Sequence, residues 1–370
     1  MAADGCTLSV CVLARSSRGG LERLLGEVAG FADEIVVGVD ASSADDTLAI
    51  ATRLADVVFR FEHVGPPVRA RRMILEHARC DWVLSLDDDE GLDTAFEPLL
   101  PALLDQSRYT HFRFPRKWIV REQPLSYVHG APWFPDWQLR LFRRDLRRVW
   151  HPGIVHSGYR VMGAGCCEHR AAILHYEPVV LTSGERAAKI DYYRQHGSEG
   201  RSERSYQTIE GHERREVVPG PARVVRRALQ RSARVIPEVM RVPPVPKTAP
   251  WGATLDVRMA DGARTGDMIM VEVVACNTGA LAWEAMSEWP QLHLSCHIRT
   301  AAGDDVQWNG PRVALPRVVE PGESATLLFS FPAPQDPGDY VIEWDLVSEG
   351  ESWFADCGSE TARTRLRVTA

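Results

Sequence analysis

The segment WVLSLDDDE (82–90) joins an apolar run to four consecutive acids, and the segments around it decide the fold. A continuous apolar run of this length is typical of a strand that is buried on both faces. EIVVGVD (34–40) has the same character and also ends in an acid, while LSVCVL (8–13) and VVFRF (57–61) are similar runs. Strands that alternate with helices predict a doubly wound, mostly parallel α/β sheet. We expect the helices at about 20–29, 47–55 and 69–78.

The composition of the 370-residue chain allows two or three domains. Its 43 basic and 50 acidic residues give a net charge of −7, which is no whole-chain sign of nucleic-acid binding. The eight cysteines form no C-x-x-C pair, so we expect reduced thiols in a cytoplasmic protein. Without a signal peptide or a run of ~20 apolar residues, any membrane contact is expected to be peripheral, at the inner face of the cell membrane.

Three regions are expected along the chain. Residues 1–197 hold the α/β domain. Within it, the aromatic-rich stretch 109–180 is expected to build part of an active site, including the region that binds a second substrate. Residues 198–250 form a basic segment that ends in the proline-rich linker VPPVPKTAP (242–250). Residues 251–370 contain short alternating segments between turn signals, which predicts an antiparallel β-sandwich. The alternating segments are TLDVRM, MIMVEVVA, QLHLSCHI, ATLLFSF, YVIEWDLV and TRLRVT.

Residues 221–236 separate on a helical wheel into an arginine side and an apolar side. One interpretation is a basic amphipathic helix that lies on an anionic membrane surface, next to a lipid-linked acceptor. The other is a helix that packs on its own domain and leaves its arginines in solvent. The wheel alone does not separate the two.

Acids close two of the predicted strands, at the edge where open α/β sheets bind ligands. Asp40 closes one strand, and the run Asp87–Glu90 closes the other. Four adjacent acids are costly unless a cation shares the site, and Mg²⁺ or Mn²⁺ with oxygen ligands is the natural partner. Such an ion would also neutralise a pyrophosphate leaving group. The alternative is a solvated acidic turn that caps the next helix.

Six segments appear in the order of one known family: LSVCVLAR (8–15), ADEIVVGVDASSADDT (32–47), RARRMILEHARCDWVLSLDDDE (69–90), WFPDWQLRLFRR (133–144), VWHPGIVHSG (149–158) and ILHYEP (173–178). Over about residues 7–195 the chain resembles glycosyltransferase family 2, the inverting enzymes with the GT-A fold. Within that family it resembles the branch of lipopolysaccharide core β-glucosyltransferases. It departs from that branch at Arg15-Ser16-Ser17, where Lys-Asn-Glu is usual, and at Ser157, where Glu is usual.

The resemblance implies a nucleotide-sugar site and a metal site in the α/β domain. Arg72 or its neighbour Arg71 would approach the nucleotide from the helix before the metal strand. The implied donor-binding residues are Ala14, Arg15, Asp40, Arg72, Asp87, Asp88 and Arg140. The implied metal ligands are Asp87, Asp89 and His156, with Asp89 the surer of the acids. His156 also has a purely structural interpretation, and for His175 that interpretation is favoured.

The resemblance further implies that Asp136 is the base that removes the proton of the acceptor hydroxyl. Inversion needs one such base, and a positioned base contributes roughly 10²–10⁴-fold to the rate. Arg140 and Arg143 would hold phosphates or orient Asp136 and keep it ionised. Alternatively, Asp136 is a structural acid paired with a nearby arginine.

The C-terminal region resembles the immunoglobulin-like modules appended to some bacterial glycosyltransferases and polysaccharide-assembly proteins. The resemblance rests on NTGALAW (277–283), LPRVVEPGE (315–323) and DLVSEGESWF (345–354). Its tryptophans are expected in the core rather than at a sugar-binding surface, because sandwiches need large inward side chains.

The whole pattern predicts an enzyme that moves a sugar from a nucleoside-diphosphate sugar to a glycan, a glycolipid or another bacterial acceptor, with Mg²⁺ or Mn²⁺ as cofactor. Polysaccharide biosynthesis is the expected context. A sugar nucleotidyltransferase is one alternative, although ARSSRGG (14–20) fits the glycine-rich loop of that class poorly. A non-catalytic glycan-binding protein is the other.

Overall fold

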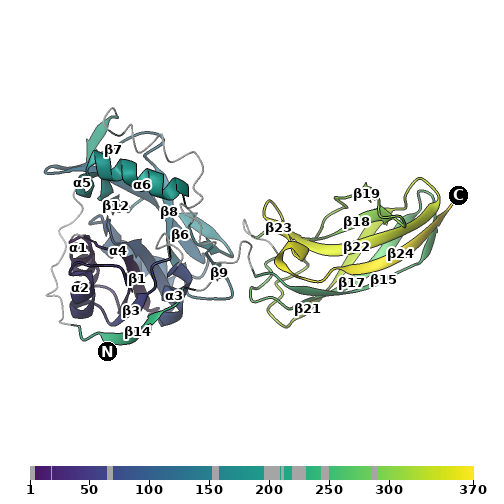
Figure 1. The fold of residues 1–370 in the computed structure, drawn as a ribbon, viewed down its shortest axis with the longest axis horizontal. Coiled ribbons are helices and arrows are strands. Elements are labelled where there is room, and N and C mark those ends of the chain that lie inside the picture. The colour runs from purple at the N-terminus through teal and green to yellow at the C-terminus, as the bar shows by residue number, and fades with distance from the viewer. Residues whose placement is uncertain are drawn as a thin grey trace. The chain divides into compact units, whose positions relative to one another are not determined.

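The computed structural model describes residues 5–17, 19–64, 70–151, 158–195, 209, 212–218, 231–242, 250–285 and 290–370. The chain divides into two compact units, which are drawn in Figure 1. The first comprises Met1–Asp145, His151–Tyr159 and Ala164–Val245. The second comprises Leu146–Trp150, Arg160–Gly163 and Pro246–Ala370.

The first unit is built on one large mixed sheet with the strand order β13-β7-β6-β8-β4-β1-β2-β3-β14. Strands β4, β1, β2, β3 and β14 run parallel, whereas β8, β6 and β7 pair antiparallel. The parallel arrangement that the sequence predicts is therefore found in one half of the sheet, from β4 to β14. The strands are β1 Leu8–Ala14, β2 Glu34–Asp40, β3 Val57–Phe61, β4 Trp82–Asp87, β5 Glu90–Leu92, β6 His111–Glu122, β7 Leu125–Val128, β8 Asp136–Arg143, β11 Gly165–Cys167, β12 Ile173–His175, β13 Arg214–Glu216 and β14 Arg234–Met240.

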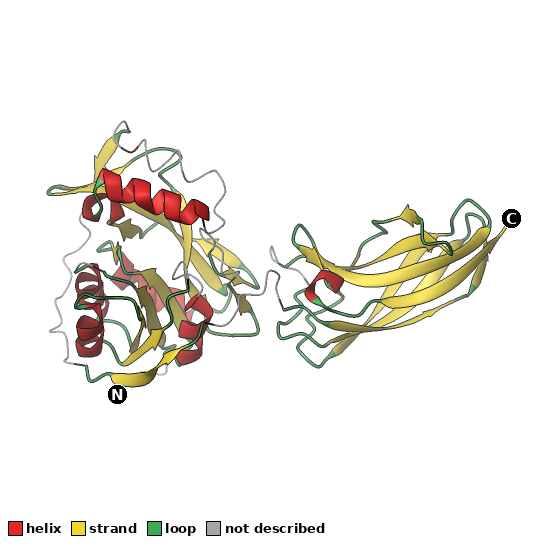
Figure 2. Ribbon diagram, in the orientation of Figure 1, coloured by secondary structure: helices red, strands yellow, loops and turns green. Residues whose placement is uncertain are grey.

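Helices flank the parallel strands on both faces, as a doubly wound sheet requires. Figures 1 and 2 show α1 and α2 on one side of β1 and β3, and α3 on the other. The order of the strands reverses after β3, because β4 pairs with β1 instead of extending the sheet beyond β3. The point between β1 and β4 where the order reverses is the switch point of the sheet. The helices are α1 Gly20–Val28, α2 Thr47–Leu54, α3 Arg71–His77, α4 Phe96–Asp105, α5 Glu177–Val180 and α6 Ser183–Gln195.

The predicted strands and helices of the first ninety residues are confirmed to within two or three residues. The reason is burial: every residue of β1 and β2 is buried, which favours the apolar runs 10–14 and 35–39 at their centres. Their side chains join those of α1 and β4 in one core, with Trp82 and Val10 fully buried. This core fixes the carboxyl ends of β1, β2 and β4 along one edge.

The basic helix expected over 221–236 is wrong at its carboxyl end, while residues 221–230 lie outside the described part. Arg234–Met240 is strand β14, which pairs parallel with β3. Val235, Ile236 and Val239 favour a strand, and Pro237 lies where the pairing register shifts, so its missing N–H is tolerated. The guanidinium of Arg231 binds the Asp56 carboxylate and the Ala32 carbonyl and therefore faces the protein. Residues 212–218 and 231–242 thus belong to the first unit rather than to a separate linker.

The second unit consists of two sheets with a shared apolar core, as expected for a sandwich. One has the order β15-β17-β21, and the other β16-β24-β22-β18-β19, with β20 and β23 on its flanks. Trp251, Trp283 and Trp344 are buried, which confirms their expected core position, whereas Trp308 is 45% exposed. The elements are β15 Ala253–Met259, β16 Gly262–Arg264, β17 Met268–Asn277, β18 Leu292–Thr300, β19 Asp305–Gln307, β20 Val313–Ala314, β21 Ser324–Pro332, β22 Gly338–Ser348, β23 Ser352–Trp353, the 3-10 turn η3 Ala355–Cys357 and β24 Ala362–Thr369.

A hairpin from the middle of the chain also belongs to the second unit. Its strands are β9 Val149–Trp150 and β10 Arg160–Val161, which pair antiparallel. Trp150 and Met162 pack into the sandwich core, and Arg148 forms ion pairs with Glu284 and Glu320. Sequence position alone assigns these residues to the N-terminal domain, so the hairpin is a feature that the composition boundary missed.

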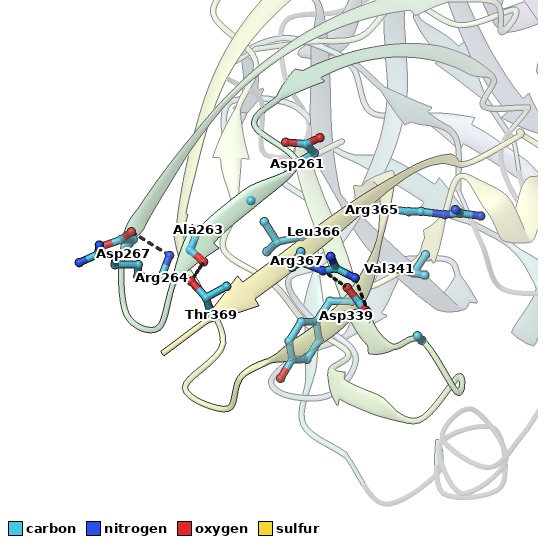
Figure 3. Close-up of a pocket in the computed structure, with 13 residues that line it drawn as sticks. Asp261, Ala263, Arg264, Asp267, Asp339, Val341, Arg365, Leu366, Arg367 and Thr369 are labelled. Carbon is cyan, nitrogen blue, oxygen red and sulfur yellow. Dashed lines mark hydrogen bonds and ion pairs between the residues drawn. The ribbon is translucent and has the colours of Figure 1, made fainter.

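A pocket of about 860 Å³ lies against β16, β22 and β24 of the second unit (Figure 3). Arginines and carboxylates line it in similar numbers, and Arg367 pairs with Asp339 at 3.0 Å. The backbone N–H of Arg264 likewise donates to the Asp267 carboxylate at 2.9 Å. Much of the charge in this pocket is therefore compensated within the pocket itself.

Among the described residues, the structure contains no helix that is both long enough and apolar enough to cross a membrane.

Candidate active site

The carboxyl ends of β1 and β2 form the first part of the site, around Asp40. β1 ends at the buried Ala14, and Arg15 follows with its Nε 3.9 Å from Asp40 Oδ2. Asp40 Oδ1 accepts hydrogen bonds from the backbone N–H and the hydroxyl of Ser42, and His63 Nδ1 lies 2.8 Å from Oδ2. Burial alone would raise the pKa of Asp40, but these hydrogen bonds outweigh it and hold the pKa below its usual value. Asp40 is therefore a fixed, ionised acceptor.

Asp88 turns from the end of β4 toward the end of β1. Its Oδ2 accepts hydrogen bonds from the Arg15 backbone N–H at 3.0 Å and the Ser17 hydroxyl at 2.7 Å. Burial and the nearby charge of Asp89 raise the pKa of Asp88 to about 7. The loop approaches α1 so closely that a Cβ at Gly20 would lie 2.6 Å from the Asp88 carbonyl oxygen, so glycine is required there. Asp88 thus ties the acidic loop to the switch point between β1 and β4.

Asp87, the first acid of the run, is held by two arginines rather than left open. Arg71 binds its Oδ1, and Arg140 Nη2 lies 2.6 Å from its Oδ2. Arg140 Nη2 also lies 2.5 Å from Oε1 of Glu90, which is fully buried. Burial first opposes ionisation of Asp87, yet the charges of Arg71 and Arg140 hold its pKa far below the usual range. In this arrangement both Asp87 oxygens already have cationic partners, which a metal would have to displace or share.

Asp89 instead faces a histidine and a second carboxylate. His175 Nε2 lies 3.4 Å from Asp89 Oδ2 and 3.6 Å from Glu177 Oε2. The three ligand atoms of this group lie within 4.8 Å of one another, and we call it the Asp89–His175–Glu177 triad. The pairing register explains the contact: β12 runs antiparallel to β5 and sets His175 opposite Glu90, the residue after Asp89.

The chemistry of the triad fits a divalent cation. Carboxylate oxygens suit Mg²⁺ and Mn²⁺, and an imidazole nitrogen suits Mn²⁺ and other transition metals. Glu177 is only 2% exposed and His175 only 3%. The buried Glu177 Oε1 and His175 Nδ1 have no hydrogen-bond partner within the described structure. Unpaired buried polar atoms are costly, and a cation bound at the triad would give Glu177 Oε1 a partner.

Asp136 begins β8 and is engaged on both oxygens. Arg116 contacts Oδ2 through Nε at 2.8 Å and Nη2 at 2.7 Å, and Trp118 Nε1 donates to the same atom at 3.0 Å. Gln138 Nε2 donates to Oδ1 at 2.8 Å. Burial opposes ionisation, but Arg116 and then the hydrogen bond from Trp118 lower the pKa of Asp136 below its usual value. The side chain remains 24% exposed, so solvent or a ligand has access to it.

Two side chains on β6 connect these groups. Arg116 lies directly opposite Asp136 in the β6–β8 register, and its Nη1 is 3.8 Å from Glu90 Oε1. Trp118 lies opposite His175 in the β6–β12 register. The two rings pack edge to face, with their centroids 4.3 Å apart. The acid that was expected to act as a base and the candidate metal ligands are therefore two sides of one polar network.

Two residues named from the sequence, Arg72 and Arg143, stand apart from this network. Arg72 points toward Glu76 on its own helix at 4.0 Å and is half exposed, so its neighbour Arg71 is the arginine at the acidic run. Arg143 donates to the Gln106 carbonyl at 2.8 Å and does not orient Asp136. His156 lies outside the described residues.

Sequence reasoning missed the two side chains that meet Asp89 and the arginine that meets Asp136. His175 and Glu177 are in ILHYEP (173–178), but the favoured interpretation of His175 was structural. A buried histidine followed two residues later by a buried acid was the available signal. Nothing in the sequence marks Arg116 among the 43 basic residues, because its role comes from the β6–β8 register.

Part of the first unit is similar to known proteins. Residues 9–163 match the family model described as Glycosyl transferase family 2. A TPR repeat-containing protein from Synechococcus elongatus is 33% identical over 99 residues, which are 27% of this chain and 24% of that protein. An uncharacterized glycosyltransferase from Rickettsia conorii is 30% identical over 112 residues, which are 29% of this chain and 38% of that protein. The chain thus spans about a quarter to two fifths of the length of these relatives. The matches support glycosyl transfer in general.

Solved structures share partial likeness with the chain. TarS from S. aureus is 12% identical, covers 98% of this chain and 77% of its own, and has a TM-score of 0.36. A CARDB domain from Pyrococcus furiosus is 16% identical, covers 33% of this chain and 91% of its own, and has a TM-score of 0.23.

Proposed function

We propose that the first unit is an inverting glycosyltransferase with a GT-A fold, which moves a sugar from a nucleoside-diphosphate donor to a hydroxyl of a glycan or lipid-linked acceptor. The observation that supports this most directly is that Asp40, Asp89 and Asp136 all lie along the same edge of the sheet. The match of residues 9–163 to the family 2 model supports this proposal. The second unit is proposed to be an immunoglobulin-like module, on the basis of its two packed sheets.

Donor binding is assigned to the ends of β1, β2 and β4. Asp40 presents an ionised carboxylate, suited to the hydroxyls of a ribose or the N–H groups of a base. The adjacent Ala14 and Arg15 would line the same pocket. Asp88 with its raised pKa anchors the loop rather than adding a full negative charge beside the donor phosphates. Arg71 and Arg140 are the arginines nearest the acidic run and limit its negative charge.

A divalent cation, Mg²⁺ or Mn²⁺, is assigned to the Asp89–His175–Glu177 triad. When bound, it would supply a Lewis acid that neutralises the charge of the departing diphosphate. Asp89 was expected as a ligand from the sequence, and His175 and Glu177 replace Asp87 in the proposed set because the Asp87 oxygens are paired with arginines. The triad is buried on the His175 and Glu177 side, which keeps these two side chains in place.

Asp136 is assigned as the base that accepts the acceptor proton. Its Oδ2 accepts hydrogen bonds from Arg116 and Trp118, whereas Oδ1 accepts one from Gln138 alone among the described residues and keeps a lone pair for the incoming hydroxyl. The lowered pKa keeps Asp136 ionised at neutral pH, at the cost of some basicity. Arg116 and Trp118 hold the carboxylate in place, so that one oxygen has a fixed direction.

The proposal is tested with the purified full-length chain, a panel of nucleotide sugars, and Mn²⁺ or Mg²⁺. Release of a nucleoside diphosphate, with the sugar transferred to an acceptor or to water, is expected. Release of diphosphate instead would identify a sugar nucleotidyltransferase. If titration calorimetry shows that no donor binds, the proposed donor site is wrong.

We further propose a cytoplasmic location, since all eight cysteines lack a disulfide partner.

A further inference from the structure

A lysine already contacts one ligand of the proposed metal site. Lys189 on α6 places its Nζ 2.8 Å from Glu177 Oε2, the oxygen that also lies 3.6 Å from His175 Nε2. We infer that Lys189 is a built-in cation that holds the Asp89–His175–Glu177 triad together until a divalent ion displaces it. The inference rests on the proposed metal site and adds a residue that opposes metal binding.

The electrostatics of the triad explain why a cation is needed there. Glu177 is almost fully buried, and Asp89 brings a second carboxylate to the same group. Two carboxylates in one desolvated site repel each other unless a positive charge compensates them. The ammonium of Lys189 contacts Glu177 directly and so places a positive charge beside the two acids of the triad.

The same contact sets up a competition. A metal at the triad would bind carboxylate oxygens at about 2.0–2.2 Å, and Glu177 Oε2 cannot be a close ligand while it faces the ammonium. The unpaired Oε1 belongs to the same carboxylate, so a divalent ion that binds it is still opposed by the ammonium charge a few ångströms away. Lys189 is 30% exposed on a flexible four-carbon stem, so its head can move into water when the metal arrives.

Replacing the lysine by an uncharged side chain of similar length should therefore strengthen metal binding. In Lys189→Met, the affinity for Mn²⁺ without nucleotide is expected to rise about tenfold or more, because a unit charge no longer opposes a divalent ion a few ångströms away. The metal-free variant should melt at a lower temperature than the metal-free wild type, since Glu177 loses its cation. Saturating Mn²⁺ should restore most of this loss.

A second buried lysine–carboxylate pair provides the matched control. Lys117 Nζ lies 3.4 Å from Asp93 Oδ2, and both side chains are largely buried. Lys117→Met should also lower the melting temperature, but its Mn²⁺ affinity should equal that of the wild type. This comparison separates the loss of any buried ion pair from the loss of the one at the triad.

The experiment titrates Mn²⁺ into full-length wild type, Lys189→Met, Lys189→Gln and Lys117→Met, and follows free Mn²⁺ by its EPR signal and stability by thermal shift. Lys189→Gln keeps a polar head and serves if the Met variant does not fold. Tighter binding only in the Lys189 variants, abolished by adding Asp89→Asn, supports the inference. Equal or weaker binding in those variants, with the wild type binding Mn²⁺, overturns the inference alone. No Mn²⁺ binding by any of them overturns the metal site as well.

Discussion

Removing Arg116 should move the acidic limb of the pH–rate profile. Arg116 is the charge that most lowers the pKa of Asp136, and it touches Oδ2 through both Nε and Nη2. An aspartate beside an arginine typically loses about 1–3 pKa units. We therefore expect Arg116→Gln to raise the pKa of Asp136, although water screens part of the effect because the two side chains are 17% and 24% exposed.

The direction in which the acidic limb moves follows from the proposed role of Asp136 as a base. A base acts when it is ionised, so activity is lost as the pH falls through its pKa. In the wild type that limb should lie below about pH 3.9, the ordinary value of an aspartate. In Arg116→Gln it should move up, toward the range above pH 4.5 where the protein is easier to assay.

The assay is kcat for sugar transfer from pH 4.5 to 8 with saturating donor. Saturation is required because Asp88, with a pKa of about 7, would otherwise alter donor binding over the same range. Arg143→Gln is the control, since Arg143 bonds a backbone carbonyl and should leave the limb where it is. An Arg116→Gln profile that is lower but has the wild-type limb would refute Asp136 as the titrating base.

Three further outcomes are expected. Asp89→Asn should remove metal-dependent binding of a nucleoside diphosphate while the fold remains, and equal affinity with and without EDTA in the wild type, measured by calorimetry, would contradict the metal site. Arg140→Met should lower the free energy of unfolding in urea by about 3 kcal/mol, because it leaves the fully buried Glu90 without its closest cation; a loss under 1 kcal/mol would contradict this account of the pair. A chain that ends at Pro243 should still bind donor, although Trp150 loses its core partners and solubility should fall; a soluble truncation that binds no donor would show that the first unit needs the second.

The parallel half of the sheet was readable from the sequence because burial there leaves a local signal. β1 and β2 are buried at every residue, and the apolar runs at their centres, residues 10–14 and 35–39, are typical of strands that are buried on both faces. The acids Asp40 and Asp87 then follow at strand ends, and strand ends in such a sheet share one edge. Local pattern and global position agree at these residues.

The rest of the site depends on strand register, which leaves no local signal. His175 reaches Asp89 because β12 pairs with β5, and Arg116 reaches Asp136 because β6 pairs with β8. Neither pairing can be derived from the spacing of these residues in the chain. The strand β14 was missed for a related reason: the pattern around Val235 suits an amphipathic helix or a strand, and only the open edge of β3 decides between them.

The central claim is tested most directly by measuring nucleoside diphosphate release and sugar transfer together, in the wild type and in Asp136→Asn. The wild type with Mn²⁺ should release one nucleoside diphosphate for each sugar transferred to the acceptor. Asp136→Asn should bind the donor within a few-fold of the wild type and transfer at least about 10²-fold more slowly. Near-normal transfer by Asp136→Asn would contradict the account, and so would the absence of nucleoside diphosphate release by the wild type with any donor.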